Sequence, residues 1–216
     1  MTTRRVTLTF DNGPTPDVTE RVLAILERAR ILSTFFVIGR NLDNPAAVEL
    51  MKQAHAAGHW IGNHTLSHTV AFGDRPERGY TVNEIEGAQA RIGAFSRAEK
   101  LFRPYGNSGL LGPHLLSRAA LDHLLAHNYR TVIWNNVPGD WRDPAGWVER
   151  CIALTSVEPW SVVVLHDIDG GCLARLPELL RRLKDLAVTF EQDFPEAITL
   201  TRAGQIVSLP HGYVTD

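Results

Sequence analysis

Five short polar segments, spread over most of the chain, contain the side chains that can carry out hydrolysis. They are DNGP at residues 11–14, NHTLSH at 63–68, RPYG at 103–106, GDW at 139–141 and LHD at 165–167. The set combines a carboxylate, a histidine pair, an arginine turn, an acidic-aromatic turn and a late histidine. Such a combination is suited to metal-assisted hydrolysis.

The histidine pair is the first candidate for metal binding. His64 and His68 are four residues apart, a spacing that can direct both imidazoles at one ion. The alternative is a pair of solvent-exposed histidines at a strand exit, because many pairs with this spacing bind nothing. Nearby His55 and His59 lack the strand-exit position, and we expect both on the surface.

Each of the other segments has a purely structural alternative. Residues 11–14 form a strong turn sequence, in which Asp11 and Asn12 would only accept local backbone hydrogen bonds. Residues 103–106 would be a simple tight turn, residues 140–141 a solvated turn and residues 166–167 a strand terminus. The position of Asp11, between an apolar strand and a helical segment, favours the functional interpretation.

Short β-rich runs alternate with longer amphipathic stretches along the chain. This pattern predicts repeated βα units with a mainly parallel sheet. Strands are expected at residues 6–10, 33–38, 60–62, 101–102, 131–134, 162–165 and 197–200. Helices are expected at residues 18–30, 45–57, 82–94, 113–127, 144–154 and 173–186. Pro113 and Pro144 would each occupy a first helical position, where the missing N–H costs nothing.

The periodicity fits a (β/α) barrel or a doubly wound sheet, and the polar residues decide between them. Asp11, His64, Arg103, Asn136 and His166 each follow a predicted strand directly. A closed parallel barrel brings those strand ends to one face. No glycine-rich nucleotide motif follows any strand. We therefore expect an α/β barrel, and the 216 residues suit one domain over residues 1–216.

Composition excludes several classes of partner. The 22 basic and 24 acidic residues are interspersed and give a net charge of −2, which disfavours nucleic-acid and membrane-surface partners. Cys151 and Cys172 lie in no metal-binding spacing and are expected to be reduced, structural thiols. Because an apolar strand begins at Val6, no room remains for a cleaved leader, and we expect a cytoplasmic protein.

Taken together, the five segments resemble the polysaccharide deacetylases, also called carbohydrate esterase family four, over residues 6–166. That family is similar in having T-F-D-D-G-P, H-[ST]-x-x-H, R-x-P-Y-G, D-W and L-x-H segments. The resemblance implies a deformed (β/α) barrel that binds a divalent metal. It implies the following roles: Asp11 as general base, His64 and His68 as metal ligands, His166 as general acid, Asp140 as the residue that orients and acidifies His166, Trp141 as a pocket wall, and the backbone N–H of Tyr105 as an oxyanion donor.

The chain departs from the family pattern at three places. Asn12 occupies the position of the third metal ligand, the turn that begins at Arg103 is one residue shorter, and Val137 stands where an acidic residue is usual. In the family the arginine contacts the residue that corresponds to Asp11. The shorter turn changes the reach of Arg103 toward Asp11, so this contact is the one that the departure puts in question. An amide oxygen is a poorer zinc donor than a carboxylate, so the metal, expected to be zinc, cobalt or nickel, would bind weakly or be absent.

The expected activity is hydrolysis of a carbon–nitrogen bond other than a peptide bond. N-deacetylation of an N-acetylated amino sugar or oligosaccharide is the leading hypothesis. One alternative is an amidohydrolase acting on a small non-sugar amide, and another is a carbohydrate-binding pseudoenzyme that has lost its metal. The sequence gives no expectation about the oligomeric state.

Overall fold

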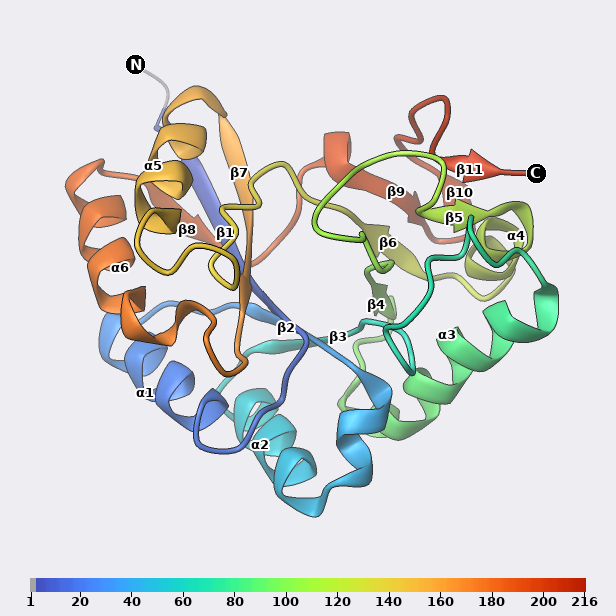
Figure 1. Cartoon of the computed structure of the whole chain (residues 1–216), viewed down its shortest axis with the longest axis horizontal. Coiled ribbons are helices and arrows are strands. Elements are labelled where there is room, and N and C mark those ends of the chain that lie inside the picture. Colours follow the sequence, from blue (N-terminus) through green and yellow to red (C-terminus); the bar gives the residue numbers. More distant parts are fainter. Residues whose placement is uncertain (1–2) are drawn as a thin grey trace. The chain divides into compact units, whose positions relative to one another are not determined.

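The computed structural model describes residues 3–216, in which strands alternate with helices (Figure 1). The α-helices are α1 Thr19–Ala29, α2 Pro45–Ala56, α3 Arg78–Ile92, α4 Arg118–Ala126, α5 Trp147–Val157 and α6 Leu176–Asp185. The strands are β1 Arg5–Asp11, β2 Thr34–Val37, β3 Trp60–Asn63, β4 Leu101–Phe102, β5 Leu116–Ser117, β6 Arg130–Val132, β7 Trp160–His166, β8 Thr189–Glu191, β9 Thr199–Arg202, β10 Gln205–Ile206 and β11 Val214–Thr215. Short 3-10 helices cover Gly39–Asp43, Gly93–Phe95, Cys172–Ala174 and Glu196–Ile198.

Contacts divide the chain into two compact units. Unit 1 comprises Met1–Phe35, Asn44–Trp60 and Trp134–Phe194, and unit 2 comprises Phe36–Asp43, Ile61–Ile133 and Pro195–Asp216. Strands β2 and β3 each have residues in both units. The assignment of residues 1–216 to one domain stays a prediction.

Unit 1 is built around β1, which pairs in parallel with both β7 and β8. Six of the seven residues of β1 and six of the seven of β7 are buried, as expected of parallel strands covered on both faces. Val6, Leu8 and Phe10 are fully buried in β1. Because β1 and β7 run in register from Arg5 opposite Trp160, their last residues, Asp11 and His166, lie opposite each other.

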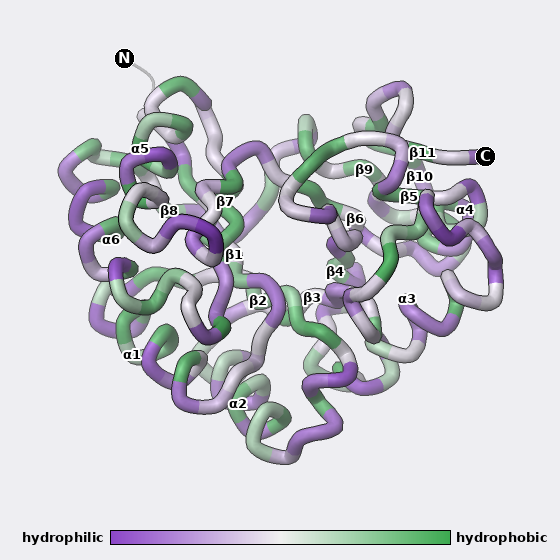
Figure 2. Tube along the Cα trace, viewed as in Figure 1, coloured by the Kyte–Doolittle hydropathy of each residue, from purple (hydrophilic) through white to green (hydrophobic). Residues whose placement is uncertain are grey.

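The helices of unit 1 bury one apolar face each. In α1 the buried residues include Val22 and Leu26, and in α6 they include Leu179 and Leu183. Hydrophobic and hydrophilic residues alternate along both helices (Figure 2), as the helical period requires. Helix α2 begins at Pro45 as predicted, with the Asn44 side chain accepting a hydrogen bond from the Ala46 N–H.

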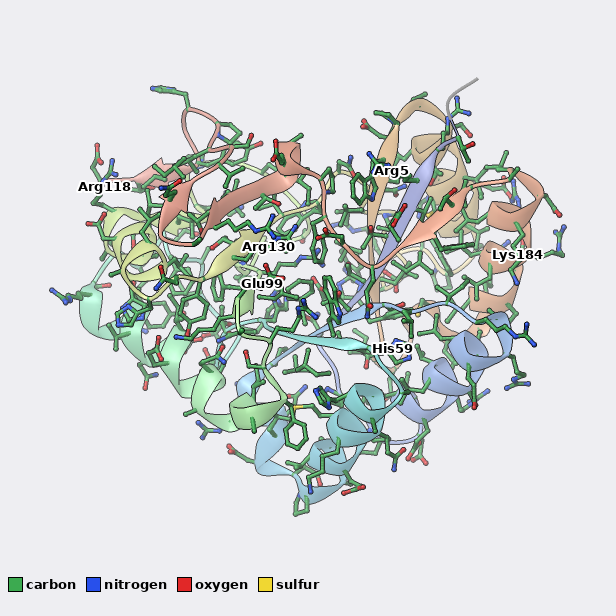
Figure 3. The ribbon with its side chains drawn as sticks, turned by 180° about the vertical axis from the view of Figure 1, so that it is seen from behind. Arg5, His59, Glu99, Arg118, Arg130 and Lys184 are labelled. Atoms are coloured by element: carbon green, nitrogen blue, oxygen red, sulfur yellow. The ribbon has the colours of Figure 1, made fainter. Side chains whose placement is uncertain are left out.

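Unit 2 has the strand order β10-β9-β6-β4-β3. Strands β3, β4 and β6 are parallel, whereas β9 runs antiparallel to β6 and to β10. The buried Arg130 begins β6 and pairs with Glu99 at 3.4 Å, a pair that Figure 3 labels. This partner is needed because an uncompensated buried charge is costly.

Two predicted helix starts are wrong. Helix α4 begins at Arg118 and not at Pro113, because Leu116 and Ser117 form β5, which pairs in parallel with Val214 and Thr215 of the C-terminal tail. Helix α5 begins at Trp147 and not at Pro144, because the Asp143 carboxylate accepts hydrogen bonds from the N–H groups of the next turn and holds Pro144 before the helix. The partner strand of β5 lies 98 residues further along the chain, so the sequence around β5 gives no local signal of this pairing.

The other predicted elements are confirmed with shifted ends. The helix expected at 82–94 is α3, which begins at Arg78, and the one expected at 173–186 is a 3-10 turn followed by α6. The strand expected at 197–200 begins at Thr199, because residues 196–198 form a 3-10 turn. The short strands β8 and β10 were not predicted.

The expectation that His59 lies on the surface is wrong. Its side chain is buried in unit 1, where Nδ1 accepts a hydrogen bond from the Ser33 N–H at 3.1 Å and the ring packs against Phe35. Burial lowers the pKa of His59 from 6.5 to about 4, against the opposing effect of the Ser33 hydrogen bond. The imidazole is therefore neutral at pH 7 and serves the fold.

Replacing His59 by Asn should flatten the acid side of the stability profile. Because the folded pKa is below the ordinary value, the unfolded chain binds more protons between about pH 4 and 6.5, and stability falls as the pH falls through this window. Between about pH 7 and 5 the wild type should lose about 2 kcal/mol more than His59→Asn. Urea unfolding at both pH values measures this, and parallel losses in the two proteins would contradict it.

Candidate active-site residues

His166, the last residue of β7, is fixed by Asp140 through two hydrogen bonds. The Nδ1–H of His166 donates to Oδ1 of Asp140 at 2.8 Å, and its backbone N–H donates to Oδ2 at 2.8 Å. Asp140 is fully buried, and His166 is 8% exposed. Because a carboxylate only accepts, the Nδ1 proton is defined and Nε2 is left as the atom that exchanges a proton with a substrate.

The surroundings of His166 favour its protonated form. Burial lowers the pKa of His166, but the hydrogen bond and charge of Asp140, with the charges of Asp11 and Asp167, outweigh burial and raise the pKa above 6.5. A raised pKa favours the imidazolium form, which can deliver a proton to a leaving amine.

Trp141 packs against the same histidine. The two rings meet edge to face, with centroids 4.5 Å apart and planes at 68°. The turn that carries Asp140 and Trp141 follows Gly139, whose φ of 75° lies in the left-handed region. This turn places Asp140 and Trp141 against His166, and the contact of Asp140 is the one that the family resemblance implies.

Asp11 ends β1 directly opposite His166 and is buried. Asn12 follows with a φ of 76° and is half-buried. In unit 1 the structure therefore brings together four predicted residues: Asp11, Asp140, Trp141 and His166. The left-handed backbone at Asn12 is a conformation that asparagine tolerates better than most residues.

Asp167 is a buried member of this group that the sequence analysis did not assign. Its Oδ2 accepts a hydrogen bond from the Thr19 hydroxyl at 2.6 Å. Burial raises the pKa of Asp167 to about 7, against the opposing effects of its hydrogen bonds and of His166. The signal in the sequence is its place directly after His166, at the end of a buried strand.

Gly13 is required by the Asp167 carboxylate. A Cβ at position 13 would lie 2.1 Å from Oδ2 of Asp167, so Gly13→Ala should destabilise the fold by about 1–3 kcal/mol. Gly79→Ala is the control, because a Cβ there meets nothing within 4 Å and is expected to be neutral or stabilising by up to about 1 kcal/mol. Chemical unfolding measures both variants, and equal stabilities would contradict the close packing.

In unit 2, His64 is oriented by the chain around Arg103. The Nδ1–H of His64 donates to the backbone carbonyl of Arg103 at 2.9 Å, and the Arg103 N–H donates to the Asn63 carbonyl. The proton is again placed on Nδ1, so Nε2 keeps its lone pair. A hydrogen bond of this kind is typical of metal-ligating histidines.

His68 lies beside His64, on a loop held by side chains. The two imidazole centroids are 4.6 Å apart, and the ring of Tyr105 packs against His68 at 4.3 Å. The Thr65 hydroxyl accepts from the His68 N–H, and the Asn63 side chain accepts from the Thr65 N–H. Both Thr65 and His68 have positive φ, a strained geometry of the kind found at functional sites.

Arg103 is fully buried in unit 2, and its guanidinium lies 4.1 Å from the centroid of the Phe36 ring and donates to the Ile133 carbonyl. The structure thus brings together His64, His68, Arg103 and Tyr105. Sequence reasoning missed the role of the Arg103 carbonyl, because a backbone acceptor carries no residue signature. It also missed the Asn63 side chain, which accepts from the Thr65 N–H. That Arg103 reaches Asp11 stays a prediction.

The donor set of the histidine loop fits a divalent cation. Because the Nδ1–H of His64 donates a hydrogen bond to the Arg103 carbonyl, the lone pair of the neutral ring lies on Nε2, where an ion can bind. The imidazole of His68 packs against that of His64. Two imidazoles suit zinc, cobalt and nickel.

Asn136 and the two cysteines have structural roles. The Asn136 amide donates to the Cys151 carbonyl and the Thr155 hydroxyl, so it anchors α5 and takes no part in the site. Cys151 and Cys172 are free and buried, as predicted. No helix within residues 3–216 is long and apolar enough to cross a membrane.

Known proteins resemble this chain in sequence and in fold. The polysaccharide deacetylase family model matches residues 1–130. A peptidoglycan-N-acetylglucosamine deacetylase of Bacillus cereus is 31% identical over 86% of this chain and 84% of the relative. A chitooligosaccharide deacetylase of Bradyrhizobium sp. (strain ANU 289) is 35% identical over 76% of this chain and 71% of the relative. A solved polysaccharide deacetylase of Bacillus cereus superposes with a TM-score of 0.73 at 25% identity, over 92% of this chain and 96% of that one.

These findings define a deacetylase-like hydrolase with an α/β fold of mostly parallel strands, and the predicted fold class is confirmed. The chain belongs to the polysaccharide deacetylase family. The family resemblance inferred from the five motifs is thereby confirmed.

Proposed function

We propose that the chain is a metal-dependent N-deacetylase that removes acetyl groups from N-acetylated amino sugars in oligosaccharides. Membership of the polysaccharide deacetylase family supports the reaction type. The observation that carries the proposal is the Asp140–His166 pair, because its hydrogen bond and charge raise the pKa of the imidazole at the end of β7 and so favour the protonated form. Protonation of the leaving amine is the step that such a group serves.

In the proposed reaction, water attacks the acetamide carbonyl and Asp11 accepts the proton that the water loses. The tetrahedral oxyanion is stabilised by the backbone N–H of Tyr105. Nε2 of His166 then donates its proton to the nitrogen as the carbon–nitrogen bond breaks. Acetate and a free amine leave, and Trp141 covers one side of the His166 ring.

His64 and His68, with Asn12 as the third donor, would hold the cation, for which zinc is the first candidate and cobalt or nickel the alternatives. When bound, a divalent cation polarises the carbonyl and makes water more acidic. The chain's own contribution is to present the His64 lone pair, which the Arg103 carbonyl fixes. Arg103 supports the site through its backbone as well as its side chain.

Asn12 makes cation affinity the property to test first. Replacing Asn12 by Asp restores a carboxylate donor, and the zinc dissociation constant should fall by at least about 10-fold. Titration of chelator-stripped wild type and Asn12→Asp with zinc, cobalt and nickel measures this. Unchanged affinity for all three metals would show that position 12 does not bind the ion.

One other function is favoured by a specific observation. An amide at the third ligand position is what a carbohydrate-binding protein without catalytic metal would have. If the protein holds no zinc after incubation with zinc but still binds chitooligosaccharide, this alternative is favoured. Amide hydrolysis that survives chelation would instead favour a metal-free amidohydrolase. The cytoplasmic location and the absence of nucleic-acid and membrane partners stay predictions.

A further inference from the structure

A second group of metal-ligating side chains lies on helices α3 and α4, apart from the residues assigned to deacetylation. Glu86 is on α3, His123 is on α4 and His127 directly follows α4. One ligand atom from each of the three lies within 4.8 Å of the others. A carboxylate oxygen and two imidazole nitrogens are the donors that zinc takes in proteins.

The contacts around the three residues orient their donor atoms. Nε2–H of His123 donates to Oε1 of Glu86 at 2.8 Å, and the hydroxyl of the buried Tyr129 donates to the same oxygen at 2.9 Å. Nδ1–H of His127 donates to the His123 carbonyl at 2.9 Å. Nε2 of His127 therefore carries the lone pair, and the two imidazoles stack with centroids 4.0 Å apart. Carbonyl and hydroxyl partners of this kind are typical of metal sites.

The group is open to solvent on one side. His127 is exposed, while Glu86 and His123 are half-buried. A surface groove of about 500 Å³ runs beside it and is lined by Pro76, Arg78, Arg118, Asp122, His123 and His127. An ion can enter from the groove, and water can complete a tetrahedral set of ligands.

We propose that Glu86, His123 and His127 bind a divalent transition-metal ion, with Zn²⁺ as the probe, and that this ion ties α4 to α3. The ion takes the place of the proton on His123 Nε2. In the neutral ring that proton moves to Nδ1, so no net proton is lost, whereas an imidazolium ring already has a proton on Nδ1 and releases the Nε2 proton to solvent. The negative charge of Glu86 partly offsets the charge of the ion. The site is independent of the deacetylation residues and does not rest on the proposed function.

The simpler explanation is that these residues only form a hydrogen-bond network between the two helices. That network accounts for the contacts among Glu86, His123 and Tyr129. It does not require His127, one ring nitrogen of which lies within 4.8 Å of a ligand atom of Glu86 and of His123. A variant at His127 therefore separates metal binding from helix packing.

The test uses the His64→Ala/His68→Ala protein, from which the proposed catalytic ligands have been removed. After chelation and equilibrium dialysis against Zn²⁺, elemental analysis should find one bound equivalent. Adding His127→Ala should weaken this binding at least about 10-fold, and adding Tyr129→Phe, which leaves all three ligands in place, should weaken it about 10-fold. Adding His211→Ala, at an exposed histidine in the C-terminal tail, should change nothing.

A second measurement uses the otherwise unaltered chain. Zn²⁺ should raise the thermal midpoint of the wild type by more than that of His127→Ala, because an ion that binds only the folded state stabilises it. His127→Ala should also bind one equivalent less than the wild type. Equal zinc content and equal thermal shifts in the two proteins would overturn the proposal, as would absence of zinc from the His64→Ala/His68→Ala protein.

Discussion

Replacing Asp140 by Asn should lower kcat about 10²–10⁴-fold with little loss of folding. The asparagine oxygen can still accept the hydrogen bond of the His166 backbone N–H, but its amide NH₂ then faces Nδ1. The imidazole is forced to accept at Nδ1 and loses the charge that raises its pKa. The single proton of the neutral ring then lies on Nε2, and a neutral imidazole is too weak an acid to protonate the leaving amine.

A pH profile distinguishes this effect from structural damage. The wild type should lose activity as the pH rises through the elevated pKa of His166, because the acid form is the one required. In Asp140→Asn this limb should move to lower pH, because the pKa falls. The control is Asp143→Asn, the same change at a residue that pairs with Arg150 on the surface. A profile displaced equally by both variants would remove Asp140 from its proposed role.

Replacing His64 by Ala should remove one equivalent of bound zinc and lower turnover by at least about 10³-fold. The estimate follows because a catalytic cation contributes several kcal/mol to the stabilisation of transition-state charge. Elemental analysis and rate measurement on the same sample check both parts. His55→Ala is the matched control, since His55 is an exposed histidine on α2. Retained zinc together with lost turnover would mean that His64 acts in some other way.

The local parts of the site could be predicted from the sequence. Asp11 and His166 end two apolar strands, and parallel strands with buried faces place their last residues side by side. Asp140 follows a glycine turn and contacts His166, a contact that the family resemblance implies. Trp141 packs against the same ring, and its role as a pocket wall stays a prediction. The places of Asp11 and His166 could be predicted because hydrophobic patterning indicates where a strand ends, whereas the contact of Asp140 with His166 is implied by the family resemblance.

The predictions that were wrong or missing concern features that depend on contacts with distant residues or with backbone groups. Helix α4 starts late because the C-terminal tail pairs with β5. His59 is buried, and the backbone N–H of Ser33 satisfies its Nδ1. The Arg103 carbonyl, which sets the proton of His64, has no sequence signature. The sequence alone does not distinguish Asp167 from an ordinary turn residue. Its burial depends on a hydrogen bond from Thr19 and on the absence of a side chain at Gly13, both distant in the sequence.

Release of acetate from N-acetylated chitooligosaccharides tests the account most directly. The zinc-loaded wild type should release one acetate for each free amine formed, should stop when the metal is chelated, and should resume when zinc is returned. Asp11→Asn, treated identically, should release acetate about 10²–10⁴-fold more slowly. If the sugar binds but no metal supports acetate release, the chain is not a deacetylase.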